Sequence, residues 1–435
     1  MAVFLPKGTR DFLPLQMRQR RQVIETVRAV FVRHGFEALE TPAFERIETL
    51  TGKYGEEGDR LIYKILKRGK GGEQGEADLA LRYDLTVPFA RVLSMNQDLR
   101  LPFKRFQMQP VWRADRPQKG RFREFWQCDV DVAGSTSPAA EAECLAVATE
   151  SLQELGFTGF TVLLNDRRIL ASFARLLGVE AREGALLVAL DKLDKVGKDG
   201  VSAELTGRGF PPELPERLWA LLDVPAENDA ALDALEARLD QGGRDGVAAL
   251  RQVLSLSAAL GVDLSRVQVA PTLARGLDYY TGPVYEIVVA DGGVGTVAGG
   301  GRYDGLIGLL SGREVPAVGI ALGLERLLTV MEERGMFADL TPEAEVFVTV
   351  FSPALLEASL KVGAGLRARG IPVEIYLGDR KLKAQFKEAD ARKSRWVVVV
   401  GPDEATAGTL TLKDLRRGGQ RVCAIDEAAE AILTG

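Results

Sequence analysis

Five arginines in the chain could hold the phosphate groups of a nucleotide: Arg113, Arg121, Arg123, Arg275 and Arg326. A guanidinium binds phosphate oxygens through two parallel hydrogen bonds and keeps its proton, so it can stabilise the charge that develops on a reacting phosphorus. The sequence contains no GxxxxGK[ST] phosphate loop, and a bound nucleotide would therefore depend on arginines. The alternative for any one of them is an ordinary paired residue at the surface.

The segment that begins at Arg121 is predicted to be a strand with one polar face. Its odd-numbered residues are Arg, Arg, Phe, Gln, Asp and Asp, and the even positions between them are mostly apolar. Side chains alternate between the two faces of a strand, so Gln127, Asp129 and Asp131 would lie on one face. That face is either the solvated side of an antiparallel sheet, which is the usual arrangement, or the floor of a polar site.

The elements around this segment predict an antiparallel hairpin downstream of a helix. Residues 101–115 and 122–134 both alternate, and the basic connector RPQKGR joins them. Upstream, residues 15–36 carry apolar side chains at helical spacing with Gly35 near their end, as in a helix that terminates at a glycine. Downstream, GVGTVA at 293–298 matches a dinucleotide-binding pattern only weakly, because glycines follow it instead of a helix.

The chain is long enough for two or three domains, because 435 residues exceed what one hydrophobic core usually supports. Its middle part is helical and rich in Leu and Ala, which predicts a helical insertion over 166–260. Strand patterns on either side predict the two parts of one α+β domain, at 1–165 and 261–335. Towards the end, apolar β-branched runs alternate with helices, which predicts a small α/β domain over 343–435.

The composition argues against several classes of chemistry. His34 is the single histidine and the three cysteines are isolated, which argues against a Ser-His-Asp or Cys-His hydrolase, a zinc site and a disulfide framework. No apolar run approaches the roughly 20 residues of a membrane span, and we see no secretory signal, so we expect a cytoplasmic protein with no membrane partner. The net charge is -5, and nucleic-acid binding would need local basic patches such as 104–123 and 378–395.

Several stretches of the chain resemble known motifs. PAFERIETL, which contains Pro42, is similar to the dimer-interface motif of class II aminoacyl-tRNA synthetases, VWRADRPQKGRFREFWQCDVD to their second motif and AVGIALGLERLL to their third. LRYDLTVPFAR, RGLDYYTGPVYE and AGGGRYDGL resemble the histidine-recognition stretches of the histidyl-tRNA synthetase family, and the resemblance covers essentially the whole chain. It implies an α+β catalytic domain built on an antiparallel sheet of the class II synthetase type, a helical insertion domain and a C-terminal α/β anticodon-binding domain.

The resemblance also implies roles for the arginines. Arg113, Arg275 and Arg326 would act in catalysis, with Arg113 on the α-phosphate of ATP and Arg326 on the γ-phosphate. Arg275 would neutralise the α-phosphate region, where many class II enzymes place a metal ion. Arg121 would also bind ATP, and Phe125 would stack on the adenine.

The same resemblance places the amino acid and the tRNA. The residues implied around the α-amino group of histidine are Asp84, Leu85, Thr86 and Gln127, and those around its imidazole ring are Asp131, Tyr279 and Tyr280. The residues implied at the tRNA are Arg116 and Lys119 in the connector and Lys383 and Lys387 in a basic helix. Asp84 and Asp131 are shorter than the glutamates of many bacterial members, which leaves the depth of the histidine site open.

The expected function is that of a histidine–tRNA ligase, which activates histidine with ATP to histidyl-adenylate and transfers it to the 3′ end of histidine tRNA. ATP would enter with Mg²⁺, no zinc or organic cofactor is expected, and the chain would form a homodimer. Two alternatives stay open: a regulatory paralogue of histidine biosynthesis that binds histidine without charging tRNA, and a tRNA-binding protein without catalysis. The complete arginine set and the C-terminal domain count against them.

Overall fold

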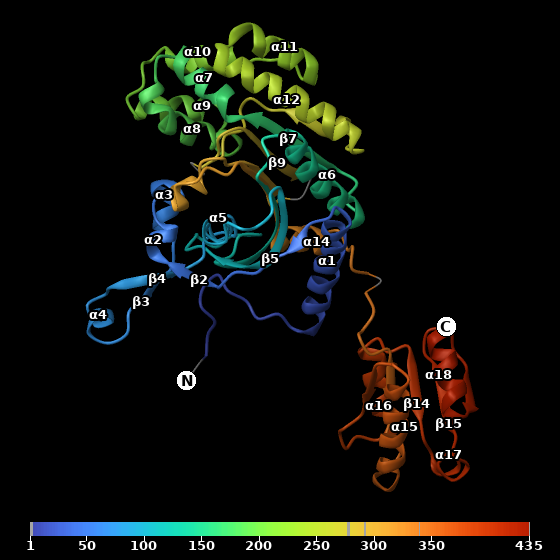
Figure 1. Ribbon diagram of the computed structural model, residues 1–435. Helices are drawn as coiled ribbons and strands as arrows, with labels where there is room; N and C mark the ends of the chain where they lie inside the picture. Colours follow the sequence, from blue (N-terminus) through green and yellow to red (C-terminus); the bar gives the residue numbers. More distant parts are fainter. Residues whose placement is uncertain (1–2, 276–278, 291–292, 339, 435) are drawn as a thin grey trace. The chain divides into compact units, whose positions relative to one another are not determined.

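The computed structural model describes residues 3–275, 279–290, 293–338 and 340–434, with residues 56, 57 and 194 described in their backbone alone. The chain divides into two compact units (Figure 1). The first unit contains most residues up to Met336, and the second contains the residues from Phe337 onwards together with Pro14–Gln19. Among the described residues, no helix is both long enough and apolar enough to cross a membrane.

The first unit is built on an eight-stranded sheet that is mostly antiparallel. The strand order is β1-β5-β6-β11-β10-β9-β7-β8, and parallel pairing is confined to the two outermost pairs of the described strands. The strands are β1 (Glu37–Ala38), β5 (Phe103–Trp112), β6 (Glu124–Ala133), β7 (Phe160–Asp166), β8 (Val267–Val269), β9 (Pro283–Val289), β10 (Thr296–Arg302) and β11 (Ala317–Gly323). This is the antiparallel sheet that the sequence predicts.

The predicted hairpin is present, but its second strand starts later than expected. β5 and β6 pair in antiparallel register along their whole lengths. Because β6 begins at Glu124, the prediction that Arg121 and Arg123 begin this strand is wrong. Arg121 and Gln118 instead exchange backbone hydrogen bonds of 2.9 and 3.1 Å across a tight turn. Gly120 in that turn has a φ of 68°, which a glycine adopts without strain.

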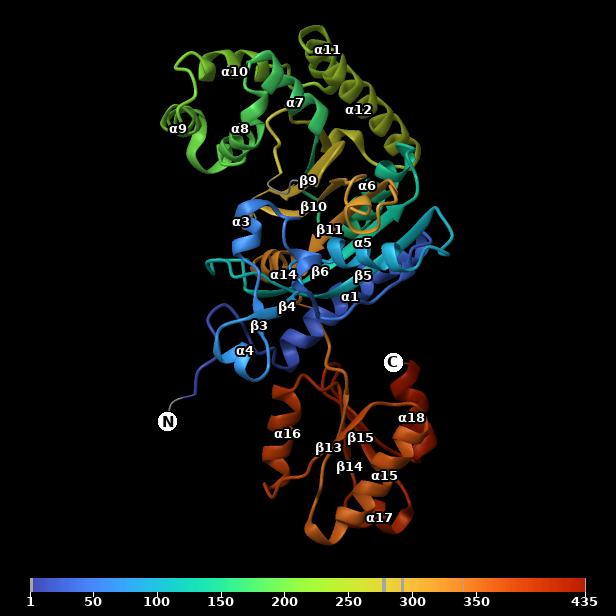
Figure 2. The same cartoon turned by 60° about the vertical axis from the view of Figure 1, so that its left-hand side comes forward.

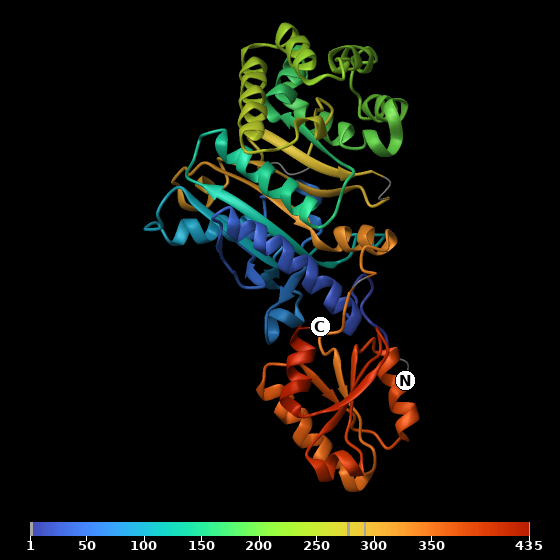
Figure 3. The same ribbon diagram turned by 90° about the vertical axis from the view of Figure 1, so that its right-hand side faces the viewer.

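Helices α1 (Pro14–Arg33) and α6 (Ala139–Glu154) cover one face of the large sheet. Figure 3 shows them side by side across the strands. The even-numbered apolar residues of β6, such as Val130, are buried on this face, whereas the odd-numbered polar residues lie on the other. Helix α1 ends at Arg33, and Gly35 follows with a φ of 74°, as the sequence predicts.

A smaller antiparallel sheet with the strand order β2-β4-β3 belongs to the same unit. Its strands and the nearby short helices are β2 (Phe44–Arg46), β3 (Lys64–Leu66), β4 (Ala77–Leu81), α2 (Ile47–Leu50), α3 (Gly55–Arg60), α4 (Lys70–Glu73) and α5 (Thr86–Met95). Apolar side chains of α5 pack with Tyr54, Tyr83 and Tyr303 in one buried cluster, near α13 (Gly308–Ser311). This cluster supports the polar face of the large sheet.

Between β7 and β8 the chain is helical. The elements are α7 (Arg167–Leu176), η1 (Glu180–Arg182), α8 (Glu183–Leu190), α9 (Leu193–Gly207), α10 (Leu214–Leu222), α11 (Asn228–Arg238), α12 (Gln241–Ala259) and η2 (Leu264–Arg266). Figure 1 shows these helices gathered at one end of the first unit, beside β7 and β9. The helical region is present, and its exact limits as a separate domain stay a prediction.

The second unit is a five-stranded mixed sheet with helices on both faces. Its strand order is β13-β12-β14-β15-β16, and β12 runs parallel to both of its neighbours. The elements are β12 (Val346–Val348), η3 (Pro353–Leu355), α15 (Leu356–Ala368), β13 (Val373–Ile375), α16 (Leu382–Ala391), β14 (Trp396–Val399), α17 (Pro402–Ala407), β15 (Leu410–Asp414), β16 (Gln420–Cys423) and α18 (Ile425–Thr434). Figure 2 shows the sheet between α16 on one side and α15 and α18 on the other.

A buried carboxylate fixes helix α14 (Leu324–Glu333), which follows β11 and carries Arg326. Glu325 is 3% exposed; one of its oxygens accepts a hydrogen bond of 2.8 Å from Arg20 of α1, and the other accepts one of 2.8 Å from the backbone N–H of Trp126 in β6. The side chain of Arg20 is itself 4% exposed. The pair therefore holds the start of α14 against the sheet.

We predict that Arg20→Met destabilises the protein by about 3 kcal/mol, because it leaves the buried Glu325 carboxylate without its main cation. Urea unfolding of the full chain measures the change. The matched control is Arg33→Met, because Arg33 pairs with Glu150 and Glu154 at the surface, where an ion pair contributes about 1 kcal/mol or less. Equal losses for the two variants would contradict the prediction.

Candidate active site

Small residues occupy the middle of the sheet face that lies opposite helices α1 and α6. One row across the sheet contains Gln107, Asp129, Ala321, Gly299 and Glu286. The next row contains Arg105, Asp131, Gly319, Gly301 and Val284. Polar side chains of β5 and β6 therefore border a strip of nearly bare backbone on β10 and β11.

Two glycines of this strip lie directly beneath side chains that the sequence predicts to belong to the site. A Cβ atom added at Gly299 would lie 1.8 Å from Nη1 of Arg275, and one added at Gly319 would lie 2.0 Å from Oδ1 of Asp131. Both distances are far below van der Waals contact. Any larger residue at either position would displace the side chain above it.

Arg113 connects the hairpin to the segment before α5. Its Nε donates to the backbone carbonyl of Tyr83 at 3.0 Å, and Nη2 donates to Oε1 of Gln127 at 3.4 Å. The guanidinium lies 4.3 Å from the centre of the Tyr83 ring and 5.1 Å from that of Phe125. The predicted phosphate ligand, the predicted adenine-stacking ring and the predicted amino-acid ligand Gln127 are therefore neighbours.

Positive charges converge on Arg326. Its guanidinium donates to the backbone carbonyl of Thr296. Burial lowers the pKa of Arg326, and the positive charges of Arg121, Arg113 and Arg275 lower it further. Arg326 of α14 therefore lies close enough to Arg121, Arg113 and Arg275 to be repelled by their charges. Such a group of cations is suited to bind a polyanion.

Arg275 lies among backbone, acid and aromatic groups. Its Nη1 donates to the carbonyl of Tyr285 at 3.1 Å and lies 3.6 Å from Oε1 of Glu286. The guanidinium is 5.4 Å from the centre of the Tyr280 ring. Glu286 also accepts a hydrogen bond of 2.6 Å from the hydroxyl of Thr296, so its carboxylate is held by two partners.

Asp84 is a buried carboxylate at the start of α5. Its Oδ1 accepts hydrogen bonds from the hydroxyl of Tyr54 at 2.9 Å and from the backbone N–H of Val87 at 3.1 Å, and Oδ2 accepts one from Tyr279 at 3.4 Å. Burial raises the pKa of Asp84, and these hydrogen bonds and the charge of Arg113 oppose that rise. Leu85 and Thr86 follow it at the beginning of the helix.

Asp131 and Asp129 are two further buried carboxylates, both 2% exposed. Oδ2 of Asp131 lies 2.7 Å from Nη2 of Arg105, and Oδ1 accepts a hydrogen bond from the hydroxyl of Tyr303. Burial raises the pKa of both acids, and for Asp129 the charge of Asp131 raises it further. Asp129 accepts the amide N–H of Gln127 at 3.3 Å, which leaves Oε1 of that glutamine facing Arg113.

Three tyrosines adjoin these acids. The ring centres of Tyr279 and Tyr280 are 4.8 Å apart, and Tyr279 packs edge-on against Tyr303 at 6.0 Å. The hydroxyl of Tyr279 donates a hydrogen bond to Asp84, and that of Tyr303 donates one to Asp131. Burial raises the pKa of all three phenols, so they are hydrogen-bond donors at neutral pH.

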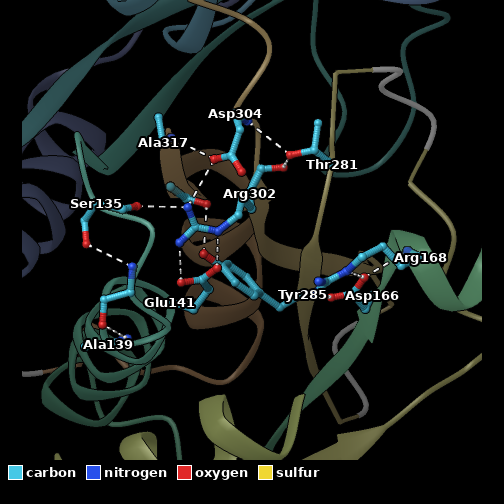
Figure 4. Close-up of polar contacts among 12 residues, drawn as sticks. Ser135, Ala139, Glu141, Asp166, Arg168, Thr281, Tyr285, Arg302, Asp304 and Ala317 are labelled. Carbon is cyan, nitrogen blue, oxygen red and sulfur yellow. Dashed lines mark hydrogen bonds and ion pairs between the residues drawn. The ribbon is translucent and has the colours of Figure 1, made fainter. Parts of the chain in front are cut away.

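A second buried ion pair holds the tyrosine-bearing segments in place. Figure 4 shows the Arg302 guanidinium between Glu141, the carbonyl of Ser135 and Asp304, with distances of 2.5 and 2.7 Å to the two Glu141 oxygens. The backbone N–H of Asp304 donates to the hydroxyl of Thr281 at 3.1 Å. The residues that follow the two neighbouring tyrosines are thereby tied to α6 and to the end of β10.

Residues that the sequence did not single out also contact the predicted ones, among them Tyr54, Arg105, Glu286, Tyr303 and Asp115, which pairs with Arg121 at 2.8 Å. Tyr303 is part of AGGGRYDGL, and Arg105 occupies an odd-numbered position on an alternating strand, so both carried a signal. No sequence pattern indicated Tyr54, because its contact with Asp84 depends on tertiary packing.

The residues predicted to contact tRNA are divided between the two units. Arg116 is exposed in the connector, and Lys119 pairs with Glu333 of α14 at 2.7 Å. Lys383 and Lys387 are exposed on α16 of the second unit. In the part of the chain that the structure describes, no three His, Cys, Asp or Glu side chains are grouped so that they could hold a metal ion.

Comparisons with known proteins cover both units. A family described as Histidyl-tRNA synthetase matches residues 8–327, and one described as Anticodon binding domain matches residues 345–434. The chain is 41% identical to a histidine–tRNA ligase of Cytophaga hutchinsonii, with 99% of each chain covered. It is 39% identical to that of Aeropyrum pernix, with 98% of this chain and 97% of the relative covered.

Solved structures also resemble this chain. A histidyl-tRNA synthetase from Nostoc sp. PCC 7120 superposes with a TM-score of 0.84 at 32% identity, covering 100% of this chain and 99% of the other. A Bacillus halodurans protein described as an ATP phosphoribosyltransferase regulatory subunit/histidyl-tRNA synthetase superposes with a TM-score of 0.73 at 22% identity, covering 89% of this chain and 97% of the other. The latter likeness concerns the fold alone.

We predict that Gly299→Ala lowers kcat/KM by about a hundredfold, because its methyl group would displace Arg275 and small misplacements of a binding group cost that much. Steady-state kinetics of the full chain measure the change. Gly184→Ala in α8 is the matched control, since a Cβ there meets no atom within 4 Å. Normal activity of Gly299→Ala would show that Arg275 has no precise task at this position.

Proposed function

The chain belongs to the histidyl-tRNA synthetase family and is an ATP-dependent histidine–tRNA ligase, and we propose that the residues of the candidate site form histidyl-adenylate. In this step a carboxylate oxygen of histidine attacks the α-phosphorus of ATP, and pyrophosphate leaves. The activated histidine then passes to the 3′ end of histidine tRNA. The observation that carries the assignment is that clustered arginines and buried acids lie beside the same glycine strip.

ATP would occupy the arginine side of the site. Arg113 and Arg275 would bind the α-phosphate, Arg326 the γ-phosphate and Arg121 the phosphate chain, while Phe125 would stack on the adenine. The repulsion between the arginines supports this arrangement, because a polyphosphate would relieve it. We propose that Mg²⁺ enters with ATP as part of the substrate complex, bound by phosphate oxygens.

Histidine would occupy the acidic side. Asp84 and Gln127, with Leu85 and Thr86 beside them, would hold the α-amino group. Asp131 would accept an imidazole N–H, and the hydroxyls of Tyr279 and Tyr280 would line the ring. An amino acid without a matching ring would leave these buried groups unpaired, which costs enough to reject it without a separate editing step.

The attacking carboxylate is already ionised at neutral pH, so the reaction needs no general base for its nucleophile. The protein would instead bring the two substrates together and stabilise the charge on the pentavalent phosphorus. Arg113 and Arg275 would supply the positive charge that stabilises this negative charge, as guanidinium groups do in phosphoryl transfer. We assign no proton transfer to any residue of the site.

The proposal also covers the partners. Lys383 and Lys387 would contact tRNA phosphates from the anticodon-binding domain, and Arg116 and Lys119 would approach the acceptor end. We further propose a cytoplasmic homodimer, with the segment around Pro42 at the interface. Support for that segment comes from the exposed Phe44 on β2, whose exposure of 51% leaves an apolar side chain available.

The proposal predicts exchange of pyrophosphate into ATP with histidine and with none of the other nineteen amino acids. Arg275→Ala should lower this exchange by at least about a hundredfold, because it removes a guanidinium from the reacting phosphate. Arg68→Ala is the control, since Arg68 is an exposed arginine outside the site. Histidine binding without any exchange by the unmodified chain would favour the regulatory alternative.

A second prediction concerns tRNA. Replacing Lys383 and Lys387 by Ala should raise the KM for histidine tRNA and flatten its dependence on salt, because each lost phosphate contact reduces counterion release. Pyrophosphate exchange, which needs no tRNA, should be unchanged. Lys361→Ala on α15 serves as the control, as Lys361 is an exposed lysine of the same unit. An unchanged KM would remove α16 from the interface.

A further inference from the structure

We propose that Arg105 is a positioning residue that sets the separation between the two ends of the histidine site. The inference rests on the proposed function, in which Asp131 binds the imidazole ring and residues 84–86 surround the α-amino group. Arg105 would touch neither substrate. It would act by holding groups from two different parts of the fold at a fixed distance.

The guanidinium of Arg105 contacts both ends of the site. Nη2 lies 2.7 Å from Oδ2 of Asp131 and donates to the backbone carbonyl of Leu85 at 3.1 Å. One nitrogen therefore bridges the carboxylate of Asp131, assigned to the ring, and the Leu85–Thr86 peptide, which lies beside the site of the α-amino group. The bridge lies in the interior, because Arg105 is 0% exposed.

Arg105 is itself held by neighbours that do not belong to the site. Nη1 donates to Oε1 of Gln107 at 3.2 Å, and the amide of Gln107 donates to Thr41 at 2.8 Å and to Gln109 at 2.6 Å. The centre of the Phe89 ring lies 4.5 Å from the guanidinium. These contacts fix the plane of the guanidinium, which suits it to define a distance.

The bridge also determines which oxygen of Asp131 faces the substrate. Oδ2 faces Arg105 as its ion-pair partner and accepts no hydrogen bond from the described residues, while Oδ1 accepts from Tyr303 and lies above the bare backbone of Gly319. A carboxylate oxygen has two lone pairs, so Oδ1 keeps one for an imidazole N–H. Arg105 therefore directs Oδ1 towards the glycine strip, where the ring would bind.

A purely structural role is the competing explanation, because a buried carboxylate needs a cation whatever its function. The two roles differ in what they do to the substrates. A structural loss lowers stability and affects ATP and histidine alike. A positioning loss weakens histidine binding selectively, because the arginines that face ATP keep their own carbonyl partners at Tyr83, Tyr285 and Thr296.

The test measures pyrophosphate exchange with Arg105→Lys and Arg105→Met and compares the KM values of histidine and ATP. Lysine keeps the charge but lacks the planar fork. We expect the KM of histidine to rise about tenfold or more in both variants, the effect of losing one buried interaction, and the KM of ATP to change by less than about threefold. Equal rises in the two KM values would overturn the inference.

Arg91→Met is the matched control. Arg91 forms a comparable ion pair with Glu45, at 2.6 and 3.1 Å, and lies on α5 in the same unit without contacting the site. It should lower the thermal unfolding temperature as Arg105→Met does and leave the KM of histidine unchanged. A selective rise in that KM for Arg91→Met would show that the loss of an ion-paired arginine elsewhere in this unit has the same effect, and would overturn the inference.

A double-mutant cycle with Asp131→Asn separates this inference from the proposed function. If Arg105 acts through Asp131, Arg105→Met should raise the KM of histidine much less in the Asp131→Asn background than alone; full additivity would overturn the inference. A normal KM in Asp131→Asn would instead contradict the proposed role of Asp131. If Arg105→Met does not fold, the KM of histidine is compared between Arg105→Lys and the double variant. The double variant should fold, because it contains no unpaired carboxylate.

Discussion

The repulsion that neighbouring arginines exert on the buried Arg326 is the constraint that the arginine part of the active site must meet. Burial and three neighbouring guanidinium groups lower the pKa of Arg326, so the free protein holds positive charges at a cost. Backbone carbonyls hold three of these arginines: that of Tyr83 for Arg113, that of Tyr285 for Arg275 and that of Thr296 for Arg326. A carbonyl positions a guanidinium without cancelling its charge. Two of the four arginines also have a carboxylate nearby, because Glu286 lies 3.6 Å from Arg275 and Asp115 lies 2.8 Å from Arg121.

The acidic part of the site must instead stabilise buried negative charge. Its carboxylates are buried, and the fold supplies phenol donors and one arginine that stabilise them without filling the space in front of them. Two groups of residues with opposite requirements therefore lie beside the same strip of β10 and β11. Each substrate brings the charge that one group lacks, which explains how a site with so many ionisable groups can belong to a stable domain.

Strand alternation predicted the polar face correctly, because the period of a strand assigns side chains to faces whatever the fold around them. It did not predict that Asp129 and Asp131 are fully buried, since burial depends on α5 and on the cluster around Tyr54. It also placed Arg121 and Arg123 in the strand, whereas a glycine turn delays the start of β6. Contacts between segments far apart in sequence, such as Tyr54 with Asp84 and Arg105 with Leu85, have no local pattern. Such contacts come from tertiary packing alone.

The strip of bare backbone on β10 and β11 limits how this enzyme could be redesigned. A side chain can be shortened to enlarge a binding site, but Gly299 and Gly319 have nothing to remove, and the peptide groups beneath them are committed to the sheet. A variant that accepts a bulkier histidine analogue would therefore have to gain its space on the side of the tyrosines. The backbone hydrogen bonds of the central strands fix one wall of the site, whereas the side chains of the tyrosine wall can be changed by laboratory evolution.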